Sequence, residues 1–219
     1  AKTLNPIRIF EMVEYAKCET VLNKEFHDYI TDDRVFGIIC HKKLEDFFIR
    51  ERLERAMEEL KAIPSGVVIV IGLGTGILCK ADIWIYCSLT RWEIQLRYRA
   101  GMPNWNCTND TAPILEKYKR GFFIEWRLSD RYKKDRYAEF DYLLDTEIKN
   151  HPKMVTGQAY REGLKQVSQK PFRMEPYFDP GVWGGKWMQT NFGLDPKQPN
   201  FAWSFDGVPE ENSFNLKYG

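Results

Sequence analysis

Two short apolar runs on either side of a glycine-rich bend constrain this chain more than any other feature. Residues 67–71 and 83–86 are rich in β-branched side chains and contain no polar residue, and Gly72, Gly74 and Gly76 follow the first run. Unbroken apolar runs are typical of strands that are buried on both faces, as in a parallel sheet with helices on each side. We therefore predict that the two runs are adjacent inner strands of such a sheet.

Apolar runs and helical patterns alternate between residues 35 and 169, which predicts an α/β region. Residues 35–40 and 140–144 are further strand candidates, and residues 6–10 fit either a strand or part of a helix. Residues 31–34, with two aspartates, predict a turn or a helix cap, because Asp side chains accept hydrogen bonds from nearby amides. This alternation favours parallel βαβ units with right-handed crossovers. We expect a parallel sheet covered by helices.

Four helices are expected, each from a start signal and an apolar stripe. The first begins at Asp46, the second is capped by Ser88, the third and longest follows Pro113, and the fourth is capped by Thr156. Serine and threonine suit these positions because their side chains accept a first-turn N–H. The inward-facing residues are expected to be Leu53, Ala56, Met57 and Leu60; Leu89, Trp92 and Leu96; Leu115, Tyr118, Phe122 and Trp126; and Tyr160, Leu164 and Val167.

The glycine-rich bend has two interpretations. It is not a Walker A loop, because no Gly-Lys-Ser/Thr follows it, and Ile77 occupies the third glycine position of the dinucleotide fingerprint. In one interpretation the glycines only make a tight turn after a strand. In the other they let a phosphorylated ligand approach the backbone closely. The ligand-binding candidates would then be Gly72, Gly74, Thr75 and Gly76.

The expected long helix carries a basic face opposite its apolar stripe, and this face also has two interpretations. A run of charge on a helix is usually a solvated face. Arginine also suits phosphate, because its planar fork donates two parallel hydrogen bonds, so some arginines could converge on the glycine bend and hold an anion. The anion-binding candidates are Arg91, Arg97, Arg99 and Arg127. The basic residues of the long helix are Lys117, Lys119, Arg120, Arg127, Arg131, Lys133 and Lys134.

Charge and hydropathy narrow the classes of partner. The 32 basic and 31 acidic residues leave a net charge of +1, whereas nucleic-acid binders normally carry a basic excess on one face. The longest apolar run, residues 67–79, is shorter than the ~20 residues that span a membrane. The first residues do not show the basic start and following apolar stretch that are typical of a signal peptide. We expect no nucleic-acid partner, no membrane association and a cytoplasmic location.

The cysteines and histidines form no recognisable metal or redox motif. Cys18, Cys40, Cys79, Cys87 and Cys107 include no CxxC pair, and we interpret them as reduced thiols of a cytoplasmic protein. The histidines, at positions 27, 41 and 151, are far apart in the sequence. We expect no metal site and no cofactor in this chain alone.

The composition changes near residue 170. Residues 171–219 are rich in aromatic residues, Gly, Pro and Asn, and their apolar runs are short. Short runs separated by turn residues indicate β structure, but the segment is too short for a complete barrel. We therefore divide the chain into an α/β region, residues 1–170, and a β segment, residues 171–219, that begins a larger domain.

The segment Pro176-Tyr-Phe-Asp-Pro-Gly-Val-Trp-Gly-Gly-Lys-Trp187 resembles the opening of the class I, cupin-type mannose-6-phosphate isomerases, and residues 201–213 are similar to the next segment of that family. Most of the chain also resembles a group of long bacterial proteins of this family, in which an α/β region precedes the cupin. The segments that carry this wider resemblance are Thr31-Asp-Asp-Arg-Val-Phe-Gly37, Thr90-Arg-Trp-Glu-Ile-Gln-Leu-Arg-Tyr-Arg99, Lys117-Tyr-Lys-Arg-Gly121 and Asp145-Thr146.

The α/β region in turn resembles a P-loop kinase of the uridine-kinase type. In that family a buried strand is followed by a glycine-containing loop, a second strand, an arginine-rich lid and a long helix. Residues 67–76, 82–86, 91–99 and 115–142 follow the same order. The P-loop itself is absent from this chain. The resemblance implies a kinase-like fold without the loop that holds the transferred phosphates.

The isomerase resemblance implies a function for a longer parent protein. That family binds zinc through a Gln-x-His motif, a Glu and a further His, all downstream of the segments matched here, so zinc is expected only in the intact parent. The chain is then part of a mannose-6-phosphate isomerase-like protein that interconverts an aldose and a ketose, and it is expected to be inactive alone. The substrate-side candidates are Trp183, Gly184, Gly185 and Lys186, which could equally form a structural turn with a packed indole.

Two other functions fit the same residues. The α/β region could be a regulatory module that binds a nucleotide or a phosphorylated sugar, or it could be a degenerate small-molecule kinase. The absent P-loop counts against the kinase. The partners expected are therefore a small phosphorylated sugar or a nucleotide, together with the downstream cupin domain of the same parent chain.

Overall fold

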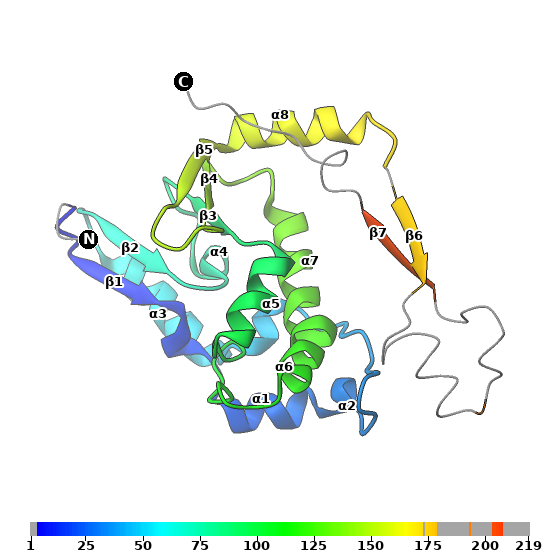
Figure 1. The fold of residues 1–219 in the computed structure, drawn as a ribbon. Helices are drawn as coiled ribbons and strands as arrows, with labels where there is room; N and C mark the ends of the chain where they lie inside the picture. The colour runs from blue at the N-terminus through cyan, green and yellow to red at the C-terminus, as the bar shows by residue number, and fades with distance from the viewer. Residues whose placement is uncertain (1–3, 173, 179–192, 194–202, 208–219) are drawn as a thin grey trace. The chain divides into compact units, whose positions relative to one another are not determined.

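The computed structural model describes residues 4–172, 174–178, 193 and 203–207, which form a mixed α/β structure (Figure 1). The chain divides into two units, Ala1–Met154 and Val155–Gly219, and each is described by itself. The elements are β1 (Arg8–Glu11), the 3-10 helix η1 (Met12–Tyr15), α1 (Glu19–Glu25), α2 (His27–Ile30), the 3-10 helix η2 (Leu44–Phe47), α3 (Arg50–Ala62), β2 (Val68–Ile71), α4 (Thr75–Leu78), β3 (Ile85–Ser88), α5 (Arg91–Arg99), α6 (Ile114–Arg120), the π-helix η3 (Gly121–Glu125), α7 (Trp126–Arg136), β4 (Tyr142–Asp145), β5 (Lys153–Thr156), α8 (Gly157–Ser168), β6 (Met174–Phe178) and β7 (Trp203–Gly207).

The described strands pair in three small sheets. β1 and β2 are parallel, with Phe10 opposite Val70. β3 and β4 are also parallel, with Ile85 opposite Tyr142, and β5 completes a sheet of order β3-β4-β5. β6 and β7 are antiparallel. The structure confirms that the chain forms parallel strands, that a strand lies near residues 140–144, and that the run at residues 6–10 contains a strand and not a helix.

The two apolar runs around the glycine bend are not neighbours in one sheet, so that prediction is wrong. β2 pairs with β1, whereas β3 pairs with β4. Gly72 and Gly74 have φ angles of 118° and 81° and turn the chain out of the strand into the short helix α4. Each run finds its partner far away in the sequence, because parallel strands need a long crossover between them.

The predicted burial of these strands on both faces is also wrong. Phe10 on β1 and Leu143 on β4 are buried, whereas Ile71 on β2 and Ile85 on β3 are 55% and 47% exposed. Each small parallel pair therefore places only some of its side chains against the rest of the unit. The main hydrophobic core of the first unit lies among the helices instead.

This core joins β1, α1, η2, α3 and the middle of the long helix. Phe26 packs edge-on against Phe47, with ring centroids 5.2 Å apart, and Phe47 stacks on Trp105 at the same separation. Ile124 and Leu128 enter the core from the long helix and are fully buried. Aromatic pairs of this kind add roughly 0.5–1.5 kcal/mol each beyond their buried area.

Helix starts differ from the predictions at two points. α3 begins at Arg50 rather than at Asp46, because Asp46 lies in η2 and its carboxylate accepts a backbone N–H there. Ser88 is the last residue of β3, and Thr90 caps α5 instead, through a 3.1 Å bond from a first-turn N–H to its Oγ1. Thr156 caps α8 as predicted.

The predicted burial of the apolar stripe is confirmed for α3 but is wrong for α5. The stripe residues of α3 are buried or pack against the core. In α5, Trp92 and Leu96 are 59% and 39% exposed, whereas Tyr98 is buried. Tyr98 stacks on Trp126 with ring centroids 6.5 Å apart, so the C-terminal end of α5 packs against the long helix.

Residues 35–40 form an extended loop and not a strand. Their backbone bonds helices rather than a neighbouring strand: Ile38 N donates to Tyr29 O at 2.8 Å, and Cys40 N donates to Phe123 O at 2.9 Å. Gly37 permits this close approach, because a Cβ there would lie 2.6 Å from Tyr29 O. Of the large apolar side chains in this run, Phe36, Ile38 and Ile39 are exposed, whereas Cys40 is buried in the core.

α6, η3 and α7 form the predicted long helix, with one π turn in its middle (Figure 1). The N–H of Trp126 bonds the carbonyl of Gly121, five residues earlier. A Cβ on Gly121 would lie 3.0 Å from the Trp126 indole, so glycine lets the ring pack on the helix backbone. In the described part of the chain, no helix is long and apolar enough to cross a membrane.

Candidate functional site

The glycine bend is filled by the protein's own side chains. The N–H of Gly76 donates to Tyr132 Oη at 2.9 Å. A Cβ on Gly76 would lie 2.7 Å from that hydroxyl and 2.9 Å from the Trp84 ring. A Cβ on Gly74 would lie 2.9 Å from Ile77. These contacts give Gly74 and Gly76 a packing role, and ligand binding at Gly72, Gly74, Thr75 and Gly76 stays a prediction.

The arginines of α5 bond partners outside the glycine bend. Arg91 pairs with Asp130 on α7, and its guanidinium lies 4.9 Å from the Trp126 ring centroid. Arg97 donates to Glu93 at 2.7 Å and to the carbonyl of Thr146 at 2.8 Å. These contacts tie α5 to α7 and to the end of β4.

The other two anion-binding candidates contact aromatic rings of α5 and of the long helix. Arg99 lies near the rings of Trp92 and Tyr118, 5.7 and 5.8 Å from their centroids. Arg127 donates to the carbonyl oxygen of Phe122 at 2.9 Å, and its guanidinium lies over the Phe122 ring. The structure does not bring the four predicted arginines together at the bend. Trp183, Gly184, Gly185 and Lys186 lie outside the described residues.

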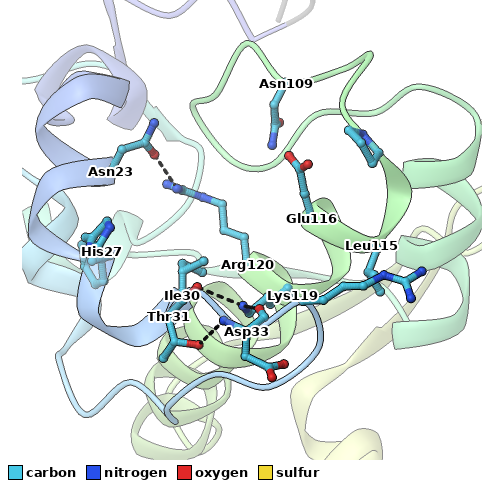
Figure 2. A pocket seen from close by; sticks show the side chains of 13 residues that line it. Asn23, His27, Ile30, Thr31, Asp33, Asn109, Leu115, Glu116, Lys119 and Arg120 are labelled. Carbon is cyan, nitrogen blue, oxygen red and sulfur yellow. Dashed lines mark hydrogen bonds between the residues drawn. The ribbon is translucent and has the colours of Figure 1, made fainter. Parts of the chain in front are cut away.

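A cavity of about 620 Å³ lies elsewhere, among α1, α2, the loop after α2, the loop before α6, and α6 itself (Figure 2). Its size is in the range of small-molecule sites. Its lining mixes cationic, acidic, amide and apolar side chains. The lining residues are Asn23, Phe26, His27, Ile30, Thr31, Asp33, Arg34, Asn109, Pro113, Leu115, Glu116, Lys119 and Arg120.

Arg120 is the most constrained charged group of this cavity. Its side chain extends from α6 towards α1 (Figure 2), where Nη1 donates to Asn23 Oδ1 at 2.6 Å. Nε donates to Glu125 Oε1 at 3.1 Å. Nη2 is buried and has no hydrogen-bond partner among the described residues. The residue as a whole is 9% exposed, and leaving a buried donor unpaired costs about 1–3 kcal/mol.

Lys119 closes the neighbouring side of the cavity. Its Nζ donates to the carbonyl of Thr31 at 3.2 Å and to that of Asp33. Asp33 Oδ1 accepts N–H groups from Val35 and Phe36, both at 2.6 Å, which confirms the predicted turn. These backbone bonds lower the pKa of Asp33 below its ordinary value. Lys119 therefore positions the loop, and its ammonium remains at the wall of the cavity.

The opposite side of the cavity offers acceptors. Asn109 forms a reciprocal pair with Asn104, in which Asn104 N donates to Asn109 Oδ1 at 2.9 Å and Asn109 Nδ2 donates to Asn104 Oδ1 at 2.8 Å. Figure 2 shows the Glu116 carboxylate beside Asn109, across the cavity from Asn23. The cavity is therefore polarised, with the guanidinium of Arg120 on one side and the oxygens of Glu116 and Asn109 on the other.

A buried polar network lies behind Arg120. Glu125, 6% exposed, accepts hydrogen bonds on Oε2 from Tyr98 Oη and Asn104 Nδ2, both at 3.0 Å. Burial, followed by the nearby Glu125 carboxylate, raises the pKa of Tyr98. Lys117 is 2% exposed and donates to the carbonyl of Tyr98 in α5, at 2.7 Å, and to two carbonyls of the α5–α6 loop.

The interpretation of the whole basic helix face as solvated is therefore wrong for its first turns. Lys117, Lys119 and Arg120 are all buried, because carbonyls, Asn23 and Glu125 satisfy most of their donors. The sequence signal was present in Lys117-Tyr-Lys-Arg-Gly121. Lys117 and Lys119 come directly before and after Tyr118 of the apolar stripe, so they project about 100° to either side of it and face neighbouring elements.

One side of the cavity is cationic. A guanidinium is held in place by two bonds with a third donor unpaired, and an ammonium and the exposed Arg34 lie near it. Among the described residues, no group of three or more His, Cys, Asp or Glu side chains could hold a metal ion.

Comparison with known proteins gives the family but no function. Residues 1–169 match the family model described as a domain of unknown function, DUF8485. The chain belongs to this family. Neither a curated protein nor a solved structure matches the chain.

Proposed function

We propose that this member of the family is a binding module for a small phosphorylated molecule, a sugar phosphate or a nucleotide, held in the cavity beside α6. The observation that supports this most directly is Arg120, which lines the cavity: Nε and Nη1 each donate one hydrogen bond, and the buried Nη2 has no partner among the described residues. A phosphoryl oxygen in the cavity would accept a charge-assisted hydrogen bond from an unpaired N–H of this guanidinium.

The rest of the cavity suits the other parts of such a ligand. Arg34 and Lys119 add positive charge around Arg120, and Glu116 and Asn109 can accept hydrogen bonds from hydroxyl groups. Ile30 and Leu115 supply apolar lining between them. A ligand with an anionic end and a hydroxylated end fits this arrangement better than a purely apolar one.

In the wider proposal, the module is the α/β part of a longer mannose-6-phosphate isomerase-like protein of sugar-phosphate metabolism. The support is the resemblance of residues 31–37, 90–99 and 176–187 to that family. In this proposal the α/β part has a P-loop-kinase-like fold, the β segment begins a cupin, and the downstream cupin holds the zinc. The five unpaired cysteines support a reducing, cytoplasmic location.

Titration calorimetry with the full chain tests the binding proposal. We expect mannose 6-phosphate or uridine monophosphate to bind, and mannose and uridine not to bind, because only the phosphorylated compounds supply the acceptor for Arg120. An affinity that is the same with and without the phosphate would contradict the proposal, and so would the absence of binding for every phosphorylated compound.

A pair of matched variants tests whether Arg120 is the receptor. Arg120→Lys keeps the charge but removes the planar fork, and it should weaken phosphate binding by about tenfold or more, since a charged hydrogen bond is worth about 1.5–3 kcal/mol. Arg50→Lys is the control, because Arg50 pairs with Glu54 in the same way but is exposed. Equal affinities of the two variants would exclude the cavity as the site.

A further inference from the structure

The π turn brings together two residues that an α-helix would keep apart. Arg120 and Glu125 are five positions apart on one continuous helix. At 3.6 residues per turn, residues five apart point in directions about 140° apart. In a π turn the i→i+5 hydrogen bond stacks such residues above one another. The Arg120 Nε to Glu125 Oε1 bond of 3.1 Å therefore depends on η3.

Glu125 is itself held in a fixed position. One carboxylate oxygen accepts from Arg120, and the other accepts from Tyr98 Oη and Asn104 Nδ2. Tyr98 and Asn104 are 3% and 1% exposed. A buried carboxylate with both oxygens bonded cannot rotate without breaking several bonds at once.

These fixed bonds determine the orientation of the guanidinium. Glu125 holds Nε from behind, and Asn23 holds Nη1 from α1. A planar guanidinium that is bonded at two of its nitrogens has its third nitrogen fixed as well. Nη2 is the nitrogen without a partner. We propose that Glu125 is a positioning residue of the anion site, which acts by orienting Arg120 and not by touching the ligand. This inference rests on the proposed function.

The proposal makes a prediction whose sign opposes simple electrostatics. A carboxylate near an anion site repels the anion, so removal of its charge alone should tighten binding. If Glu125 orients Arg120, its removal frees the guanidinium to rotate, and binding should weaken although the site becomes more positive. The direction of the change therefore separates the two effects.

The experiment measures inorganic phosphate affinity of the full chain by calorimetry, at a temperature where circular dichroism shows each variant to be folded. Glu125→Gln should weaken binding by about tenfold, from the loss of one charged hydrogen bond that holds Arg120. The matched control is Glu139→Gln, which removes a carboxylate paired with Arg136 on the exposed surface and should leave the affinity unchanged.

A double-mutant cycle distinguishes positioning from general damage to the fold. In an Arg120→Lys background, Glu125→Gln should change phosphate affinity by less than about twofold, since the group that Glu125 orients is no longer present. Equal losses in both backgrounds would overturn the proposal. The proposal would also be overturned if the Glu125→Gln single variant bound phosphate as tightly as the unmodified chain, or more tightly.

Tyr98→Phe serves if Glu125→Gln does not fold, because it removes one bond to Glu125 and leaves the Arg120–Glu125 pair intact. It should weaken phosphate binding by about threefold, in line with the loss of one neutral donor, and an unchanged affinity would overturn the positioning role. Failure of the unmodified chain to bind phosphate would instead contradict the proposed function itself, before any variant is compared.

Discussion

Tyr98 shows at the scale of one residue how the buried network depends on protonation. Its hydroxyl donates to Glu125 Oε2 at 3.0 Å and accepts from Asn104 Nδ2 at 3.1 Å. A phenolate at this place would be desolvated and would face a carboxylate. The pKa of Tyr98 is therefore raised, first by burial and then by Glu125.

The raised pKa predicts a loss of stability in alkaline solution. The contribution of the neutral phenol is fully present below the ordinary Tyr pKa of 10 and is lost as the pH rises from there towards the higher folded pKa. Through this one group, the free energy of unfolding can fall by up to about 1.4 kcal/mol per pH unit. Tyr98→Phe lacks this group, so the stability advantage of the unmodified chain over the variant should shrink between pH 9 and pH 11.

Urea unfolding of both proteins at several pH values measures this difference. Other tyrosines, cysteines and lysines titrate in the same range in both proteins, so only the difference between the two curves reports on Tyr98. A stability gap that stays constant from pH 9 to pH 11 would show that the phenol is not shifted.

Arg120 marks the limit of prediction from sequence at this scale. Its place in a basic helix was evident, but its burial was not, because Asn23 lies 97 positions earlier in the chain. Local pattern reports which residues share a helix face. It does not report which distant amide or carboxylate will satisfy a buried cation, and that partner decides whether the cation is solvated or held in a cavity.

At the scale of elements, Lys117 joins α6 to the end of α5 and the loop that follows it. Its ammonium donates to the carbonyls of Tyr98, Met102 and Asp110, at 2.7, 3.2 and 2.8 Å. Three backbone acceptors thus depend on one buried side chain. The same loop carries Asn104 and Asn109, so Lys117 fixes one wall of the cavity indirectly.

Replacement of Lys117 should therefore cost more stability than replacement of a surface lysine. Lys117→Met keeps most of the side-chain volume but leaves the three carbonyls without their donor, and we expect a loss of about 2–5 kcal/mol in the free energy of unfolding. Lys61→Met, at the exposed end of α3, should stay within about 0.5 kcal/mol of the unmodified chain. A loss below 1 kcal/mol for Lys117→Met would contradict this role.

Element positions were largely predictable, whereas strand partners were not. The apolar stripe of α3, the cap at Thr156 and the strand near residues 140–144 follow from local periodicity and capping. β2 pairs with β1 across a connection of more than fifty residues. Local sequence periodicity does not predict a pairing over that distance. The π turn was equally hidden, because it depends on how Trp126 packs over Gly121.

At the scale of the whole molecule, three boundaries fall at different places. The family match covers residues 1–169, the contact units divide after Met154, and the composition changes near residue 170. The cavity lies well inside all three, since its lining runs only from Asn23 to Arg120. The described lining residues of the proposed binding site therefore all belong to the first unit.

This placement predicts that a shortened chain, residues 1–169, folds and binds phosphate like the full chain. Every residue that lines the cavity, and every residue of the network behind it, is retained. The dissociation constant for phosphate should agree within about twofold, since no bonded group is lost. A chain cut after residue 140 is the matched control, because it removes β4 and leaves β3 without its parallel partner.

The comparison is made by calorimetry and by thermal unfolding of the three chains. The chain of residues 1–169 should unfold cooperatively and be stabilised by phosphate, as mass action requires of any ligand that binds only the folded state. The chain cut after residue 140 should unfold at a lower temperature. If residues 1–169 fold but no longer bind phosphate, the C-terminal segment must contribute to the site, and the cavity beside α6 would be incomplete without it.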